Sequence, residues 1–195
     1  MSILLVAGLG NPGREYAKTR HNAGFAVIEA LASRHGLIWR KQSRFAATMA
    51  RWTPPSGAVC ILAKPATFMN DSGIAVRLLA DFHRIPPDDI IAIYDDLTIE
   101  LGRVKITQRG SAGGHNGVAS LLAHLAPGFT RYRIGIGPKH PPEMDLKDFV
   151  LGKFTPDEQT IFDQQLITYL EGLDLLLEQG PARAMNQLNR RDRTL

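Results

Sequence analysis

A histidine and an aspartate in this sequence have the chemistry needed to activate a water molecule. His21 lies at the entrance of a predicted helix, and histidine is the usual general base near neutral pH. Asp95 and Asp96 follow a predicted strand at residues 90–94. Because adjacent strand residues point to opposite faces, the two carboxylates make a poor catalytic pair. One of them could instead orient His21. The non-catalytic alternatives are that His21 is a helix cap and that Asp95 is a turn residue.

Three asparagines at similar places could bind uncharged polar groups. Asn11 follows the first predicted strand, Asn70 precedes a predicted helix, and Asn116 ends a glycine-rich loop. Open α/β sheets bind ligands beyond the carboxyl ends of their strands, so we expect these amides to share a cleft with the histidine and the aspartate. An ordinary helix N-cap is the alternative interpretation of Asn70.

The sequence favours water as the nucleophile in that cleft. No serine stands in a G-x-S-x-G turn. The single cysteine, Cys60, lies in the apolar stretch 58–62 and is expected to be buried and inert. A water molecule activated by His21 is therefore the expected nucleophile.

Two glycine-rich segments flank these candidates. Residues 8–13 match the G-x-G-x-x-G pattern of dinucleotide sites, but Pro12 lacks an N–H and the next helix is expected only near Asn22. We therefore interpret this segment as a tight turn that presents Asn11. Residues 110–117 allow close backbone approach, and His115 and Asn116 then enter a helix whose N-terminus favours anions.

A metal-dependent hydrolase is an alternative interpretation of the same residues. His21, His115 and Asp95 could form a face of two histidines and one carboxylate. Their spacing in the sequence is not a local ligand signature, so we expect no metal and no other cofactor.

Apolar periodicity and turn residues predict alternating strands and helices. Strands are expected at residues 3–10, 45–52, 58–62, 90–94, 103–107 and 131–137. Helices are expected at residues 22–35, from Ile74 to Phe82, after the loop at 110–117, and at 162–177. A turn at 54–57 indicates a hairpin. We therefore expect an α/β fold, a single domain over residues 1–195 with a twisted mixed β-sheet and helices on both faces, and a loose basic tail at about 189–195.

Composition narrows the class of protein. The chain has 195 residues, of which 44% are hydrophobic and 22% are charged, as in ordinary globular domains. One cysteine excludes a disulfide framework and a cysteine-based zinc site. The first residues do not form a signal peptide, and no apolar run approaches the roughly 18 residues of a membrane span. We expect a soluble cytoplasmic protein without membrane contact.

The basic charge is unevenly distributed along the chain. Residues 141–180 hold nine acidic and two basic side chains, a net charge of −7. Because the whole chain carries +4, the remaining 155 residues carry +11. Sixteen of the 23 basic residues are arginine, which suits bidentate phosphate contacts. This pattern favours a polyanionic partner on one face, although a solvated surface is the alternative.

The order of motifs resembles that of the bacterial peptidyl-tRNA hydrolases. The shared segments are Gly8-Leu9-Gly10-Asn11-Pro12-Gly13, Tyr16 with Thr19-Arg20-His21-Asn22-Ala23-Gly24, Phe68-Met69-Asn70, Ser72-Gly73, Asp95, Gly113-Gly114-His115-Asn116-Gly117, Arg133-Ile134-Gly135-Ile136-Gly137 and Phe149-Val150-Leu151-Gly152-Lys153-Phe154. The resemblance implies hydrolysis of the ester between a peptide and a tRNA ribose by a metal-free monomer. In that family the residue matching His21 is the base and the one matching Asp95 orients it.

The same resemblance implies a substrate-binding set. It implies a catalytic role for Asn11 beside His21 and Asp95. It also implies that Asn70 and Asn116 help to position peptide, ribose and water. Tyr16, Met69, His115 and Arg133 complete the set at the acceptor end of peptidyl-tRNA.

One position departs from the family pattern at the phosphate clamp. The resemblance implies that Arg133 and a lysine grip the terminal phosphate of the tRNA, but Thr107 stands where the lysine is expected. Lys105 and Arg109 lie two positions to either side, and on a continuous strand they would share its face. Either could supply the charge. A catalytically inactive RNA-binding homologue is a further alternative, against which the presence of both His21 and Asp95 argues.

Overall fold

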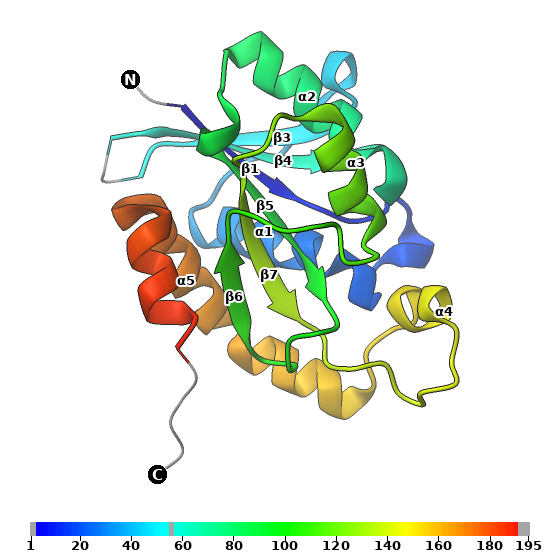
Figure 1. The fold of residues 1–195 in the computed structure, drawn as a ribbon. Coiled ribbons are helices and arrows are strands. Elements are labelled where there is room, and N and C mark those ends of the chain that lie inside the picture. The colour runs from blue at the N-terminus through cyan, green and yellow to red at the C-terminus, as the bar shows by residue number, and fades with distance from the viewer. Residues whose placement is uncertain (1–2, 55–56, 191–195) are drawn as a thin grey trace.

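One mixed β-sheet organises the protein. The computed structural model describes residues 3–54 and 57–190. Its sheet has the strand order β2-β3-β4-β1-β5-β7-β6 (Figure 1). The strands are β1 (Ile3–Gly8), β2 (Arg40–Gln42), β3 (Ala47–Trp52), β4 (Val59–Pro65), β5 (Ile90–Asp96), β6 (Val104–Thr107) and β7 (Thr130–Gly135). The central strands β4, β1, β5 and β7 run parallel, and the remaining pairs are antiparallel. The predicted mixed sheet and the β3–β4 hairpin are confirmed.

Helices cover both faces of the sheet, as predicted. The helices are α1 (Ala23–Arg34), α2 (Ser72–His83), α3 (Asn116–His124), α4 (Leu146–Leu151) and α5 (Pro156–Leu188), with single 3₁₀ turns η1 (Arg14–Tyr16), η2 (Arg20–Asn22), η3 (Ser43–Phe45), η4 (Met69–Asp71) and η5 (Pro87–Asp89). Helices α1 and α5 lie on one face and share a core that includes Ile28 and Tyr169. Helices α2 and α3 lie on the other face, where Leu79 and Leu121 join a second core.

The helix expected from Ile74 to Phe82 is confirmed as α2, but most of the large apolar residues in this segment do not face the core. Ile74, Leu78 and Phe82 are exposed, whereas Leu79 is buried. The core face is made instead by smaller residues such as Ala75 and Val76, because α2 packs closely on the sheet and on α3. Helical spacing alone does not say which of two apolar faces turns inward.

Two glycines bring α1 directly against the sheet. A Cβ atom on Gly8 would lie 2.6 Å from the Gly24 carbonyl oxygen, and one on Gly24 would lie 2.3 Å from the Ile93 carbonyl oxygen. The helix therefore crosses the ends of β1 and β5 at backbone contact. The first glycine of the G-x-G-x-x-G segment serves this contact, and α1 begins ten residues after Gly13. This geometry agrees with the prediction that the segment is not a nucleotide-binding loop.

The long helix α5 begins at a complete cap and turns sharply near its end. The Thr155 hydroxyl accepts a hydrogen bond from the Glu158 N–H, and the Glu158 carboxylate accepts one from the Thr155 N–H. Gly180, with a φ of 78°, and Pro181 break the helical course. Asn189 does not begin a loose tail as expected, because its side-chain amide is hydrogen-bonded to the Ile106 N–H and C=O at 2.8 Å each. The rest of the expected tail, from residue 191, lies outside the described residues.

Among the helices in the described ranges, none is both long enough and apolar enough to span a membrane.

Candidate active site

A cavity of about 590 Å³ opens beyond the carboxyl ends of the parallel strands. Nine of the residues predicted for the site line it: Asn11, Tyr16, His21, Met69, Asn70, Asp95, His115, Asn116 and Arg133. The other two, Lys105 and Arg109, do not line it. The strand ends thus bring together residues from distant parts of the sequence, as expected of an open α/β sheet.

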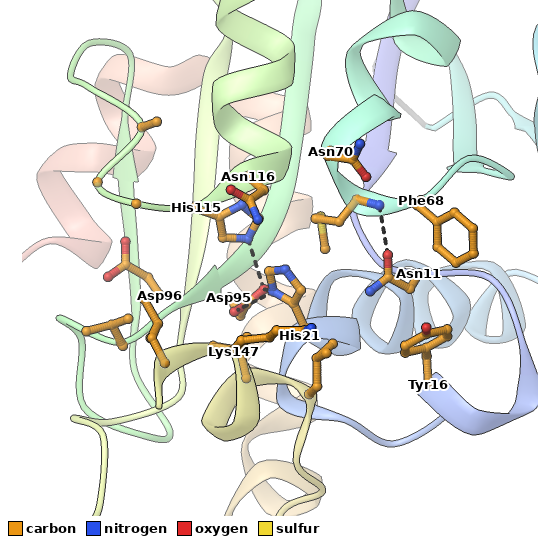
Figure 2. Close-up of a pocket in the computed structure, with 18 of the residues that line it drawn as sticks. Asn11, Tyr16, His21, Phe68, Asn70, Asp95, Asp96, His115, Asn116 and Lys147 are labelled. Atoms are coloured by element: carbon orange, nitrogen blue, oxygen red, sulfur yellow. Dashed lines mark hydrogen bonds and ion pairs between the residues drawn. The ribbon is translucent and has the colours of Figure 1, made fainter. Parts of the chain in front are cut away.

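His21 and Asp95 meet at the base of this cavity. The His21 Nδ1 atom lies 3.0 and 3.1 Å from the two carboxylate oxygens of Asp95 (Figure 2). Asp95 is near the end of β5, and His21 is in η2, which the glycine contact of α1 holds against the end of that strand. Both residues are buried. The pairing of these two side chains was predicted, and the structure provides its geometry.

Asp95 also receives a second imidazole. The His115 Nε2 atom lies 3.0 Å from Asp95 Oδ1. On the other side of the ring, His115 Nδ1 accepts hydrogen bonds from the Gly117 and Val118 N–H groups, so this side chain caps α3. Sequence reasoning placed His115 at the helix entrance but did not foresee this N-cap or the hydrogen bond to Asp95. Histidine is not among the residues preferred at N-caps, so the sequence carried no signal for this role.

The two rings determine the charge of the carboxylate. Burial alone would raise the pKa of Asp95, but the adjacent His115 and His21 rings outweigh it and hold that pKa well below its usual range. Asp95 is therefore ionised at neutral pH, and an ionised carboxylate can only accept hydrogen bonds.

This constraint fixes the positions of the protons on both imidazoles. His115 accepts backbone N–H groups at Nδ1, so its proton is on Nε2 and is donated to Asp95. His21 faces the carboxylate with Nδ1, so it donates from that atom. In the neutral ring, the Nε2 atom of His21 then carries the lone pair that a general base requires.

Asn11 is held by three hydrogen bonds beside the His21–Asp95 pair. Its backbone N–H donates to Asn22 Oδ1 at 2.8 Å, and its C=O accepts from Asn22 Nδ2 at 3.0 Å. Its side-chain oxygen accepts from the Met69 N–H at 2.7 Å. With the amide oxygen fixed in this way, the Asn11 NH₂ group is the part of the side chain left to bind a ligand.

The other predicted amides lie nearer the mouth of the cavity. Asn70 and Asn116 are both exposed and line the cavity. Asn70 does not cap α2, since Asp71 occupies that position. Tyr16 packs edge-to-face with the exposed ring of Phe68, another lining residue, with the ring centroids 6.2 Å apart. Phe68 was missed as a site residue because an apolar side chain carries no chemical signal in a sequence.

The expected phosphate clamp has a different geometry from the one predicted. Arg133 Nε donates to Asp96 Oδ2 at 2.8 Å, at the edge of the cavity. Asp96 also lines the cavity, although adjacent strand residues were expected to point to opposite faces of the sheet. Lys105 is the direct partner of Arg133 in the β6–β7 register, and Thr107 faces Arg131.

Arg109 does not share the face of Thr107 as expected. Strand β6 ends at Thr107, and Arg109 lies beyond it in the loop with an exposed side chain. The predicted strand at residues 103–107 also ends at Thr107, and the shared face would have required a strand that continued through residue 109. Lys105 is thus the cation that the sheet places beside Arg133.

Helix α4 forms a wall of the cavity that sequence reasoning missed. Asp145, Leu146, Lys147, Val150 and Leu151 line the cavity from this side. The helix has only 6 residues, too few for a clear periodic pattern. Its N-cap, in which the Asp145 carboxylate accepts from the Lys147 N–H, is the local signal that could have indicated it.

The ligand set of the metal alternative is also brought together. One ligand atom each from His21, Asp95 and His115 lies within 4.8 Å of the others. Each imidazole directs its proton-bearing nitrogen toward the carboxylate in the assignment above, and a protonated nitrogen cannot bind a metal. The observed arrangement fits a hydrogen-bonded triad better than a ligand set.

The fold and the cavity together define a class of protein: a small α/β enzyme with an imidazole–carboxylate pair at its strand ends. Neither serine nor cysteine occurs among the described residues that line the cavity. The sequence profile of the family described as Peptidyl-tRNA hydrolase matches residues 5–194. The chain therefore belongs to the peptidyl-tRNA hydrolase family, a family of hydrolases.

Individual relatives agree over nearly the whole chain. The Peptidyl-tRNA hydrolase of Gloeobacter violaceus is 44% identical, with 98% of this chain and 96% of the relative covered. That of Lactiplantibacillus plantarum is also 44% identical, over 95% of this chain and 99% of the relative. A crystal structure of peptidyl-tRNA hydrolase from Acinetobacter baumannii superposes with a TM-score of 0.88 at 38% identity, covering 96% of this chain and 94% of that chain. The predicted family is confirmed.

Proposed function

We propose that this protein hydrolyses the ester between a peptide and the ribose of tRNA in peptidyl-tRNA, and so releases free tRNA. The observation that carries the proposal is the buried His21–Asp95 pair, with its ring and carboxylate atoms 3.0 Å apart, at the base of a cavity lined by side-chain amides. Membership of the family supports the choice of substrate.

The chemistry follows from the positions of the protons. His21 Nε2 accepts a proton from water while the water oxygen attacks the ester carbonyl carbon. The resulting imidazolium is stabilised by the ionised Asp95. As the tetrahedral intermediate collapses, the bond to the ribose oxygen breaks and that oxygen takes the proton from His21. Base catalysis of this kind contributes roughly 10²–10⁴-fold to the rate.

Neutral amides suit the peptide side of this substrate. The free NH₂ group of Asn11, together with Asn70 and Asn116, can bind peptide amides, ribose and the attacking water. An amide donor directed at the developing oxyanion would add further stabilisation. Such a site would discriminate against aminoacyl-tRNA, which lacks the peptide carbonyl that the Asn11 NH₂ group could bind.

One chain suffices for the reaction. All the proposed catalytic and amide groups come from a single molecule, which supports action as a monomer. We place the acceptor end of the tRNA over the cavity mouth, with Arg133 beside the terminal phosphate, and we place the reaction in the cytoplasm, where tRNA is used.

Turnover of a peptidyl-tRNA mimic tests the proposal. The wild-type protein should release free tRNA, and His21→Ala should reduce kcat by at least about 10²-fold while tRNA binding is kept. Asp95→Asn should reduce kcat less, because the base itself remains. His35→Ala, at the C-cap of the α1 helix that follows His21, is the control and should retain activity. An active His21→Ala enzyme would refute the assignment of the base.

The same assay decides between the alternatives. A wild-type protein that binds tRNA but gives no turnover would favour the inactive RNA-binding homologue. The metal-dependent alternative is tested separately, because ligand atoms of His21, Asp95 and His115 lie close together. Activity lost on dialysis against a chelator and restored by a divalent metal would favour that alternative, whereas unchanged activity supports the metal-free mechanism.

A further inference from the structure

The residue that precedes His21 is a buried arginine, which does not line the cavity. Arg20 is 7% exposed and is absent from the residues that line the cavity. Its Nη2 atom lies 2.6 Å from the Glu158 carboxylate, in the first turn of α5. Its Nη1 atom donates to the Lys153 carbonyl at 2.9 Å and to the Phe149 carbonyl at 3.3 Å. A buried arginine with this many partners connects separate segments of the chain.

The segment that Arg20 holds is the C-terminal end of α4. The Arg20 backbone N–H donates to the Gly152 carbonyl at 3.0 Å. The guanidinium also stacks over the Phe149 ring, with its carbon 4.4 Å from the centroid, and approaches Phe154 at 5.4 Å. A cation at the C-terminus of a helix complements the partial negative charge there. Thus Arg20 fixes α4 by charge, hydrogen bonds and stacking at once.

Helix α4 is also a wall of the cavity. Leu146, Lys147, Val150 and Leu151 face the cavity from one side of the helix, while Phe149 is buried beneath it. In Figure 2 this helix lies beside the His21–Asp95 pair, with Lys147 labelled on it. Arg20 and His21 are consecutive residues of η2. The distance between the proposed base and this wall therefore depends on the contacts of Arg20.

We propose that Arg20 is a positioning residue, which holds the α4 wall at a fixed place relative to His21 so that the cavity fits its substrate. This inference rests on the proposed function. His21 and Asp95 keep their own contacts to β5 and α1 without Arg20, so the effect falls on substrate binding rather than on the proton transfer.

Two substitutions and one control separate this role from general stability. Arg20→Lys keeps the charge but cannot reach Glu158 and two carbonyls together or stack as a plane. Glu158→Gln keeps an amide oxygen for the Thr155 N–H cap and removes only the charge partner. Arg34→Lys alters another ion pair to α5, in which the arginine is more exposed: Arg34 lies 3.0 Å from Asp174, and neither residue lines the cavity.

We expect KM for the peptidyl-tRNA mimic to rise about 10-fold in Arg20→Lys, with kcat within about 3-fold and the pH profile unchanged. Glu158→Gln should show a smaller rise of the same kind. Hydrogen exchange of the amides at residues 149–152 should be faster in both variants. Arg34→Lys should match the wild type in KM and in exchange at these amides.

The outcomes distinguish the two levels of inference. Absence of turnover in the wild type would overturn the proposed function. The hydrogen-exchange measurement would still show whether Arg20 holds the end of α4 in place. Unchanged KM in both folded variants, a fall in kcat alone, or the same rise of KM in Arg34→Lys would each overturn the positioning role of Arg20.

Discussion

Asp95 is the residue on which the order of the site depends. Its carboxylate accepts from the rings of His21 and His115, and His115 in turn caps α3 through its other nitrogen. One buried side chain therefore couples the proposed base to the start of a helix on the opposite face of the sheet. Substitution of Asp95 would leave two imidazole N–H groups without their acceptor, and a buried polar group without a partner is destabilising.

The depressed pKa of Asp95 predicts how stability depends on pH. The pKa of Asp95 in the folded state lies below the reference value of 3.8 that applies to the unfolded chain. Its ionised form therefore contributes stability in full above about pH 4, and this contribution is lost as the pH falls from there through the folded-state pKa. Denaturant unfolding of the wild type and Asp95→Asn at a series of pH values should show the difference between them shrinking below pH 4.

The control for this experiment is Asp163→Asn, an aspartate exposed on α5. It should leave the dependence of the unfolding free energy on pH close to that of the wild type. A difference between wild type and Asp95→Asn that is constant from neutral to acid pH would contradict the proposed ionisation.

At the scale of elements, the sequence predicted which segments form the sheet but not every contact between them. Apolar runs ending in polar residues identify strand ends, and parallel strands bring those ends to one edge, so His21, Asp95 and Asn116 could be assigned to one cleft. The expectations that failed concern which face of an element a residue occupies. Arg109 lies beyond the end of β6 at Thr107, and α2 exposes Ile74, Leu78 and Phe82 although Leu79 is buried.

Long-range partners were beyond the reach of sequence patterns. Nothing near Arg20 in the sequence indicates that its guanidinium meets Glu158, which is 138 residues away. The N-cap role of His115 and the wall formed by α4 likewise depend on tertiary packing. Such contacts join segments that no local pattern relates.

The close approach of α1 to the sheet predicts that Gly24→Ala is severely destabilising. A Cβ atom there would lie 2.3 Å from the Ile93 carbonyl oxygen and 2.7 Å from the Leu9 nitrogen, both backbone atoms that cannot turn aside. We expect a loss of at least about 2–3 kcal/mol in the free energy of unfolding, measured with denaturant. Ala26→Ser, at an exposed position of the same helix, should change stability by less than about 0.5 kcal/mol. A stable Gly24→Ala variant would show that α1 can shift away from the sheet.

The pairing of β6 with β7 changes the prediction for the phosphate clamp. Lys105 lies beside Arg133 in the register, whereas Arg109 lies beyond the strand. We expect Arg133→Ala to raise KM by about 10-fold with little change in kcat, as for lost uniform binding. Lys105→Ala should have a weaker effect of the same kind, and Arg109→Ala the weakest of the three.

Substrates with and without the terminal 5′-phosphate provide the test. The effect of Arg133→Ala should be confined to the phosphorylated substrate. Equal weakening with both substrates would mean that Arg133 acts through its ion pair with Asp96 instead of through the phosphate.

At the scale of the whole molecule, charge is separated along the chain. Residues outside 141–180 carry +11, whereas the acidic segment 141–180 includes α4 and most of α5. A polyanion is therefore attracted by the basic remainder and repelled by the acidic segment. This asymmetry predicts long-range attraction of tRNA together with a preferred orientation.

Binding of tRNA should accordingly weaken steeply with salt. Each phosphate neutralised contributes a slope of about −0.7 for single strands in a plot of log K against log salt concentration. Several contacts should give a slope of about −2 or steeper, measured by fluorescence anisotropy with labelled tRNA and an active-site variant that cannot turn over. A flat plot would reject the basic face as a binding surface.

The contacts of Arg20 also have a consequence for biosynthesis. Its partners on α4 and α5, Phe149 and Glu158, lie 129 and 138 residues further along the chain. Domains fold as the chain emerges from the N-terminus onward, so the cavity cannot acquire its final wall until Glu158 has left the ribosome. A growing chain of this protein is itself attached to tRNA through an ester. Under the proposed function, the cavity that would hydrolyse such an ester is therefore completed only after most of the chain has been made.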